Sequence, residues 1–296
     1  MKLFSPILFI AYVTLLASCG NGSHSTVSEP MAFELRFNAV SGTESVNCDQ
    51  VLHQLGSSSA NASLLDFSVF IHGLKFLRAD GSSVEASLDS SEWQARNVAL
   101  LDFQDRSDSC SGSIKPTNKS IRGSLPNKED FVAIEFTLGV PPELNHVDPS
   151  SVEAPLNASN MFWSWQSGYK SMRIDLSPEG GIHRPGDPDF LGTNYFFHLG
   201  STGCSGDPIR GEAVSCARVN QPVIRLNTFN IESNAIKIDV ARLVNGLDIQ
   251  SDVADSPGCM SSEFDTECGA FFDNLGLNLS SGQSSPDLLQ TVFSVQ

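Results

Sequence analysis

The sequence has 296 residues, of which 40% are hydrophobic, and its 34 acidic side chains outnumber 18 basic ones for a formal net charge of -16. This length and composition suffice for one large or two small hydrophobic cores. The acidic balance, without a basic run, argues against nucleic acid and against electrostatic docking to anionic lipid, and is typical of an extracytoplasmic protein that attracts cations.

The amino-terminal segment predicts export and lipid attachment. Met1 and Lys2 form a short positive start, residues 3–16 are almost wholly apolar, and residues 16–19 read Leu-Ala-Ser-Cys. The apolar run is too short for a spanning helix and is typical of a bacterial lipoprotein signal. We expect residues 1–18 to be removed and Cys19 to carry the lipid as the membrane anchor. The alternative is an ordinary secretory signal with a chance cysteine.

The residues after Cys19 predict location and the start of the folded part. Gly20 rather than Asp follows the cysteine, which by the usual bacterial sorting pattern favours the outer membrane, facing the periplasm or the cell surface. Residues 19–31 read as a Ser/Gly-rich flexible tether. Residues 32–296 are predicted to form one β domain, with two coupled sub-domains as the alternative.

Strands dominate the predicted elements in chain order. Segments rich in β-branched and aromatic residues, several alternating apolar with polar, are separated by turn signals. They span residues 33–39, 66–77, 84–88, 98–103, 121–126, 131–138, 170–176, 195–199, 223–226 and 235–240. A short helical turn is predicted at 51–56, a Gly/Pro loop at 178–189 and a short helix at 239–244. This pattern predicts an all-β fold, an antiparallel β-sandwich-like domain with long loops.

Six cysteines remain in the mature chain besides Cys19. They are Cys48, Cys110, Cys204, Cys216, Cys259 and Cys268. An even number in an exported protein predicts three disulfides. Fifteen pairings are available in principle; local spacing favours Cys204–Cys216 and Cys259–Cys268, which leaves Cys48–Cys110. The alternative is that some of the thiols bind metal, but no CxxC pair occurs and an oxidising compartment disfavours free thiols.

The segment 161–170 concentrates chemically distinctive residues. It reads MFWSWQSGYK. In an extended chain Trp163 and Trp165 point to the same face. Three interpretations are open: two large core residues, a platform that stacks on a sugar ring together with Tyr169, or part of a metal site.

Imidazole and thioether groups could supply metal ligands. The histidines lie near apolar residues, and imidazole and thioether suit copper. The candidates are His72, His146, His183, His198, Met161, Met172 and Met260. A lone histidine is more often a hydrogen-bonded core or surface residue, and no HxH or HxxxH pair occurs, so a site must be assembled across loops. No common hydrolase or nucleotide-binding signature is found, and we expect a protein that is not an enzyme.

Five segments in fixed order carry a resemblance to a known family. They read FTLGVPPELNH (136–146), APLN (154–157), MFWSWQSGYK (161–170), FHLGSTGC (197–204) and PGCMS (257–261). This series resembles the MbnP family, metallo-mystery pair proteins with a four-cysteine motif found beside methanobactin operons and in other copper settings. The resemblance runs from about residue 33 to residue 293, and the four motif cysteines correspond to Cys204, Cys216, Cys259 and Cys268.

The resemblance implies an extracytoplasmic copper-binding protein. Its partner would be MbnH, a dihaem enzyme of the MauG/bacterial cytochrome c peroxidase superfamily, which oxidises the first Trp of the WxW motif to kynurenine. Carried over, the kynurenine forms at Trp163, with Trp165 beside it. The predicted copper ligands are His146, His198, His72 and the modified Trp163. Because the partner must reach it, Trp163 is expected near the surface and close to a histidine.

Two other functions stay open from the residues. A carbohydrate- or small-ligand-binding surface lipoprotein would present Trp163, Trp165 and Tyr169 as an open shelf beside carboxylates. A purely structural surface lipoprotein is the other. Clustered imidazoles near Trp163 would favour the metal instead.

Overall fold

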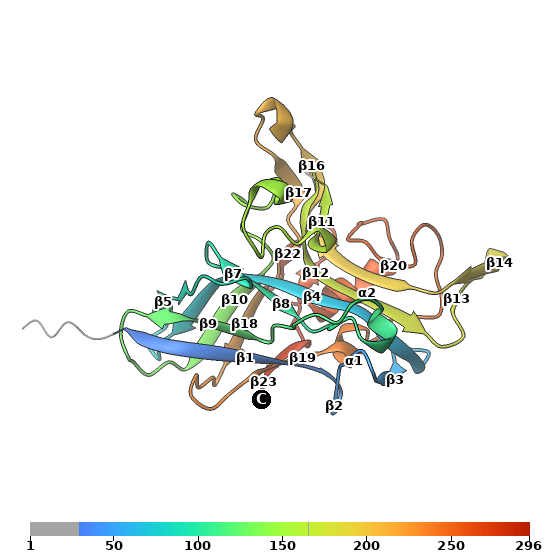
Figure 1. Ribbon diagram of the computed structural model, residues 1–296. Helices are drawn as coiled ribbons and strands as arrows, with labels where there is room; N and C mark the ends of the chain where they lie inside the picture. The colour runs from blue at the N-terminus through green and yellow to red at the C-terminus, as the bar shows by residue number, and fades with distance from the viewer. Residues whose placement is uncertain (1–29, 165) are drawn as a thin grey trace, which may run out of the picture.

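The computed structural model describes residues 30–164 and 166–296, which fold into two β-sheets packed against each other (Figure 1). This architecture confirms the predicted all-β, sandwich-like class. Within this part of the chain, no helix is both long and apolar enough to cross a membrane. The predicted signal peptide, Cys19 and Trp165 lie outside the described residues.

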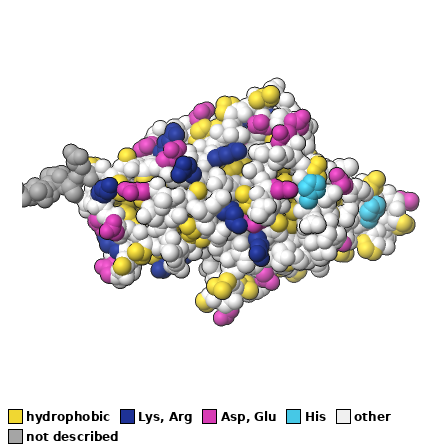
Figure 2. Space-filling view, turned by 90° about the horizontal axis from the view of Figure 1, so that it is seen from below, with side chains coloured by type: hydrophobic (Ala, Val, Ile, Leu, Met, Phe, Trp, Pro, Cys, Tyr) yellow, Lys and Arg dark blue, Asp and Glu magenta, His cyan; other side chains and the backbone are white. Residues whose placement is uncertain are grey.

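The surface carries interspersed charges. Figure 2 shows one face on which Lys and Arg side chains are scattered among Asp and Glu, with no extended basic patch on that face. The net charge of the whole sequence is -16.

The smaller sheet has the strand order β23-β19-β1-β9-β6, with β2 paired to β1. In β1, Phe33, Leu35 and Phe37 are buried while Glu34 and Arg36 are exposed, as the two-residue period of a strand requires. The strands are β1 (Met31–Ser41), β2 (Glu44–Ser45), β6 (Ser87–Leu88), β9 (Ser120–Leu125), β19 (Ile236–Asp239) and β23 (Phe293–Val295). β1 begins one residue before the predicted start of the β domain.

The larger sheet follows the path β18-β10-β4-β12-β15-β20, and five further strands join it. Its strands are β3 (Val51–Leu55), β4 (Ala60–Leu77), β5 (Ser83–Glu85), β7 (Gln94–Ala95), β8 (Val98–Asp102), β10 (Ala133–Leu138), β11 (Phe162–Ser164), β12 (Gly168–Pro178), β15 (Tyr195–Gly200), β18 (Val223–Asn227) and β20 (Gly258–Cys259). β4 is the longest strand and pairs with β10, β12, β3, β5 and β8.

Three hairpins and short helical segments complete the fold. The hairpins are β13 (Ile182–Arg184) with β14 (Asp187–Gly192), β16 (Thr202–Ser205) with β17 (Ser215–Arg218), and β21 (Leu277–Asn278) with β22 (Gln283–Ser284). The helices are α1 (Val240–Leu243), α2 (Cys268–Asn274), and the 3-10 turns Asp108–Cys110, Pro149–Ser151, Ser159–Met161 and Pro208–Arg210. The β16–β17 hairpin projects from the top of the molecule in Figure 1.

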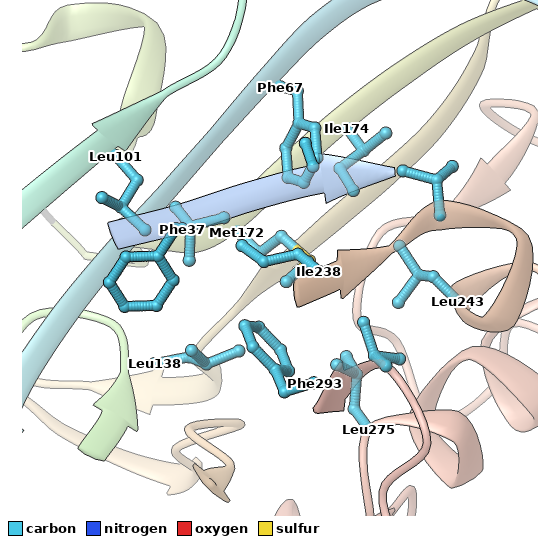
Figure 3. Packing of buried hydrophobic residues seen from close by; sticks show 14 of the residues in the cluster. Phe37, Phe67, Leu101, Leu138, Met172, Ile174, Ile238, Leu243, Leu275 and Phe293 are labelled. Atoms are coloured by element: carbon cyan, nitrogen blue, oxygen red, sulfur yellow. The ribbon is translucent and has the colours of Figure 1, made fainter. Parts of the chain in front are cut away.

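The main core fills the space between the sheets. Figure 3 shows Phe37 and Ile238 of the smaller sheet among Phe67, Met172 and Ile174 of the larger one. All five side chains are fully buried. Burying a side chain of this size contributes about 1.5–3 kcal/mol, so this interface is the principal source of stability.

A second, smaller core covers part of the outer face of the larger sheet. The loop after β10 lays Val140, Leu156 and Met161 on Phe70 of β4, and the cluster also contains Tyr169. The ring of Tyr169 lies edge-on to Phe70 and its hydroxyl donates to the Leu156 carbonyl. This packing brings β11, and with it Trp163, onto the outer face.

The three predicted disulfides form. They are Cys48–Cys110, Cys204–Cys216 and Cys259–Cys268. The first and third are buried, whereas Cys204 and Cys216 are partly exposed within the ladder of the projecting hairpin.

Four local expectations need correction or completion. Residues 51–55 form strand β3 rather than a helical turn, because they pair with β4. The predicted loop at 178–189 contains part of the β13–β14 hairpin. The sheets are not purely antiparallel, since β1–β19 and β15–β20 are parallel. Helix α2 was not predicted, whereas the helix expected at 239–244 is found as α1.

Candidate functional site

Trp163 is held on the outer face by the hairpin that β11 makes with β12. Phe162 pairs with Tyr169, and Ser164 with Gly168. The Trp163 side chain is half-buried and lies over Gly200 of β15: a Cβ added at Gly200 would come within 2.6 Å of Cζ3 of the indole. Residue 200 must therefore be glycine for the indole to occupy this position.

His198 lies next to the indole. Its ring centroid is 6.3 Å from that of Trp163, with the planes tilted by 49°. The buried imidazole contacts the Asp175 carboxylate through Nε2, at 2.7 Å from Oδ1. Nδ1 is also buried and has no hydrogen-bond partner among the described residues. Trp163 thus lies near the surface and beside a histidine, as expected.

The Asp175 contact determines which nitrogen of His198 can bind a ligand. An ionised carboxylate only accepts hydrogen bonds, so Nε2 carries the proton and the neutral ring has its lone pair on Nδ1. Burial lowers the pKa of His198, although Asp175 opposes this effect. Metal-binding histidines commonly have this arrangement: one ring nitrogen donates a hydrogen bond to a carboxylate, and the other binds the metal.

Asp175 is fixed by a buried ionic network. Arg173 pairs with Asp175 and, through Nη1, with Asp66 at 3.1 Å. Burial raises the pKa of Asp175, but the hydrogen bonds from His198 and Arg173 outweigh it, and the net shift is downward. Asp175 therefore stays ionised at neutral pH.

Lys170 also lies close to the indole. Its Nζ donates to the Asn160 carbonyl at 2.8 Å and is 5.8 Å from the centroid of the Trp163 ring. Burial, followed by repulsion from Arg173, lowers the pKa of Lys170 to about 8. An ammonium group and an imidazole thus both lie close to the indole.

The exposed edge of the indole opens on a groove of about 420 Å³. The groove is lined by Trp163, Gln166, Ser167, Ser201, Thr202, Gly203, Cys204 and Met260. Met260 is the thioether that shares this groove with Trp163. The other two candidate thioethers, Met161 and Met172, are fully buried in the two cores.

His146 lies against the projecting hairpin. Its Nε2 is 3.6 Å from Sγ of Cys216 and 3.3 Å from Nδ2 of Asn145. That His146 and His198 share one ligand set stays a prediction.

His72 lies farther along the larger sheet. The strand register pairs His198 with Arg173 and Arg173 with Ser68, four residues before His72 on β4. With about 3.3 Å per residue and about 4.8 Å between strands, the Cα atoms of His72 and His198 are about 16 Å apart. This separation is too large for one ion at about 2 Å from each nitrogen. Burial lowers the pKa of His72, which interacts with Gln221.

Tyr169 contradicts the sugar-platform hypothesis. Its ring is 1% exposed and packs edge-on against both Phe70 and Phe162. A sugar ring cannot reach Tyr169. The predicted stacking surface of Trp163, Trp165 and Tyr169 therefore does not include Tyr169.

Sequence reasoning did not single out Lys170, Asp175 or Arg173. Two signals were present: Lys170 belongs to the distinctive segment, and the charged residues alternate with apolar ones in β12. What could not be seen is that β15 places His198 opposite that charged face.

The intact site does not fit copper fully, because an indole offers only an N–H donor. The imidazole of His198 fits, since its buried Nδ1 has an available lone pair. A change that gave residue 163 a nitrogen or oxygen donor would complete a pair of ligands.

Comparisons with known proteins agree on one family. The sequence model of the MbnP family matches residues 30–261. The solved structure of MbnP from Methylosinus trichosporium has a TM-score of 0.83 and 28% sequence identity, and the alignment covers 90% of this chain and 98% of that chain. No curated protein matches the sequence.

Proposed function

This chain belongs to the MbnP family, and from that premise we propose that it binds copper in the bacterial cell envelope, as a carrier or sequestering protein rather than an enzyme. The site would use His198 and the product of Trp163 oxidation. Copper is then the cargo of the protein.

The observation that carries this proposal is the pairing of Trp163 with a buried imidazole whose Nδ1 has no partner among the described residues. Desolvating a nitrogen lone pair without a hydrogen bond costs about 1–3 kcal/mol. A bound metal ion would satisfy that atom, and Asp175 already holds the ring in the tautomer that binding needs.

The modification would supply the second ligand. Oxidation breaks the C2–C3 bond of the indole and adds one oxygen atom to each carbon. Hydrolysis then releases the C2 carbon as formate and leaves kynurenine, with an aromatic amine and a ketone. A dihaem MbnH-like enzyme of the MauG/bacterial cytochrome c peroxidase superfamily would be the oxidant, using two equivalents of hydrogen peroxide per tryptophan.

The surface position of Trp163 supports such a partner. The indole is half-buried and borders the 420 Å³ groove, so electrons can leave it over a short path to a docked haem protein. A lipid on Cys19 would keep this protein at the outer membrane.

The first test is peptide mass spectrometry across residues 161–170. We expect kynurenine at Trp163 in protein made with the dihaem partner and peroxide, and tryptophan when the partner is absent. The modified protein should bind one copper ion, and the unmodified protein should not bind at this site. His198→Ala should weaken copper binding at least about tenfold.

A matched control is His53→Ala, because His53 is exposed and bonds only to the Asn61 side chain in the described structure. It should leave copper binding unchanged. Unmodified Trp163 in partner-treated protein, or copper binding that is insensitive to His198→Ala, would contradict the proposal.

A further inference from the structure

We propose that the projecting β16–β17 hairpin contains a second, redox-gated site, in which reduction of Cys204–Cys216 creates a Cu(I) site with two thiolates and the imidazole of His146. This site is distinct from the one proposed at Trp163 and does not depend on tryptophan oxidation. Its ligand atoms, Cys204 Sγ, Cys216 Sγ and one ring nitrogen of His146, lie within 4.8 Å of one another.

The spacing suits one ion. Ligands at about 2.3 Å for sulfur and about 2.0–2.1 Å for nitrogen lie at most about 4.6 Å apart around a shared metal. The two cysteines are directly paired across β16 and β17, so both sulfurs already point to the same side. Small side-chain rotations after reduction would complete the set.

His146 is oriented for this role. Its Nε2 is the atom closest to the disulfide, 3.6 Å from Cys216 Sγ. The neighbouring Asn145 is anchored to β12, because its backbone and side-chain oxygens both accept from the Tyr169 N–H. The Asn145 amide nitrogen, a donor, approaches the same Nε2 at 3.3 Å, which favours the tautomer with the lone pair on Nε2; a metal ion would replace this hydrogen bond.

The hairpin can keep its shape without the disulfide. Its backbone ladder extends from Thr202–Arg218 to Ser205–Ser215. At its base, Arg218 donates to Thr202 and pairs with Glu263 at 2.6 Å. The β16–β17 pairing therefore does not depend on the S–S bond alone.

Access makes the reduction selective. Cys204 and Cys216 are partly exposed, whereas Cys48, Cys110, Cys259 and Cys268 are buried. An external dithiol would transfer two electrons and two protons to the Cys204–Cys216 bond and close as its own disulfide. Each cysteine would then give up its thiol proton when Cu(I) binds. Two thiolates and an imidazole favour Cu(I), a soft cation, over harder ions.

The test uses full-length protein produced without the dihaem partner, with mass spectrometry confirming tryptophan at 163. An immobilised phosphine reduces the protein under anaerobic conditions and is filtered away. Alkylation and peptide mapping should label Cys204 and Cys216 alone. Titration of Cu(I) against a chromogenic chelator should show one equivalent bound, at least about 100-fold tighter than in the oxidised protein.

Substitutions distinguish Cu(I) binding at this site from non-specific Cu(I) binding by free thiols. His146→Ala should weaken the reduction-dependent binding at least about tenfold and remove a Cu–N distance from the X-ray absorption spectrum, while His53→Ala should not. Cys204→Ser with Cys216→Ser should abolish the effect, and its unchanged circular dichroism would show that the hairpin survives without the bond.

Three results would overturn the proposal: no additional Cu(I) after reduction, binding that His146→Ala leaves unchanged, or tighter retention of Zn(II) than of Cu(I) in the same competition. Failure here leaves the kynurenine site standing, because that site requires oxidised Trp163 and His198 instead.

Discussion

His198 is a candidate ligand because its other nitrogen is occupied. Asp175 holds Nε2, Arg173 holds Asp175, and burial keeps the ring neutral. At the same scale, Gly200 makes room for the indole and Lys170 covers it. The chemistry expected at Trp163 therefore depends on a few side chains from β12 and β15.

Gly200→Ala should displace the indole. The new methyl group would meet Cζ3 of Trp163 at 2.6 Å, and overpacking of this kind costs about 1–3 kcal/mol. A crystal structure of the variant should show Trp163 and His198 farther apart than 6.3 Å, and kynurenine formation should fall.

Gly186→Ala is the matched control, because nothing lies within 4 Å of a Cβ at that position. It should preserve both stability and modification. An unmoved indole in Gly200→Ala would refute the steric argument.

The wild-type protein should lose stability as pH rises because of Asp265, and Asp265→Asn should remove this pH dependence. Burial, and then Glu267, raise the pKa of Asp265 to about 7. A raised folded pKa stabilises the protein at low pH, and this contribution is lost as pH rises through about 7. The unfolding free energy of Asp265→Asn, relative to wild type, should increase by about 1–2 kcal/mol between pH 5 and pH 8, after allowance for solvent screening.

Urea unfolding at several pH values measures this difference, with Asp287→Asn, at an exposed position, as the matched substitution. A flat profile for Asp265→Asn would show that Asp265 titrates normally.

At the scale of elements, the disulfides have different roles. Cys48–Cys110 and Cys259–Cys268 are buried within the packed domain, and α2 begins at Cys268. Cys204–Cys216 instead joins two strands of a hairpin that projects from the domain. Its reduction should therefore leave the sandwich folded.

Removing the buried disulfide Cys48–Cys110 should cost more than removing Cys204–Cys216. The sequence separations are 62 and 12 residues, and loop-closure entropy predicts losses of about 4 and about 3 kcal/mol respectively. The two double Cys→Ala variants, compared by denaturant unfolding, measure this order. A larger loss for Cys204–Cys216 would indicate that the hairpin supports the sandwich.

At the scale of the whole molecule, two sheets share one core, and a loop from β10 to β11 adds a smaller core outside it. The first core provides stability and the second positions Trp163. The outer face of the larger sheet thus carries the candidate site without interrupting the main core.

Phe37→Ala should destabilise the entire domain. Phe37 is fully buried between the sheets and lies edge-on to Phe136 at 5.9 Å. Loss of a buried phenylalanine typically costs about 3–5 kcal/mol. Thermal unfolding should show one transition at a lower temperature, whereas Leu289→Ala, at an 83% exposed position, should change stability by less than about 0.5 kcal/mol. Two separated transitions in Phe37→Ala would indicate that the sheets unfold independently.

The sequence by itself determined the local features of this protein. Alternation in 33–39 and the β-rich segments indicated the strands, because side-chain direction along a strand depends only on neighbouring residues. Cysteine number and spacing indicated the disulfides, and the segment 161–170 indicated the site.

Only the tertiary structure decided which strands pair, including the parallel β1–β19 pair across some 200 residues. It also decided that His198 rather than His72 lies beside Trp163, that His146 faces the hairpin disulfide, and that Tyr169 is buried. These are contacts between distant segments, which depend on sheet register and on packing of the whole core, and neither is encoded in local spacing.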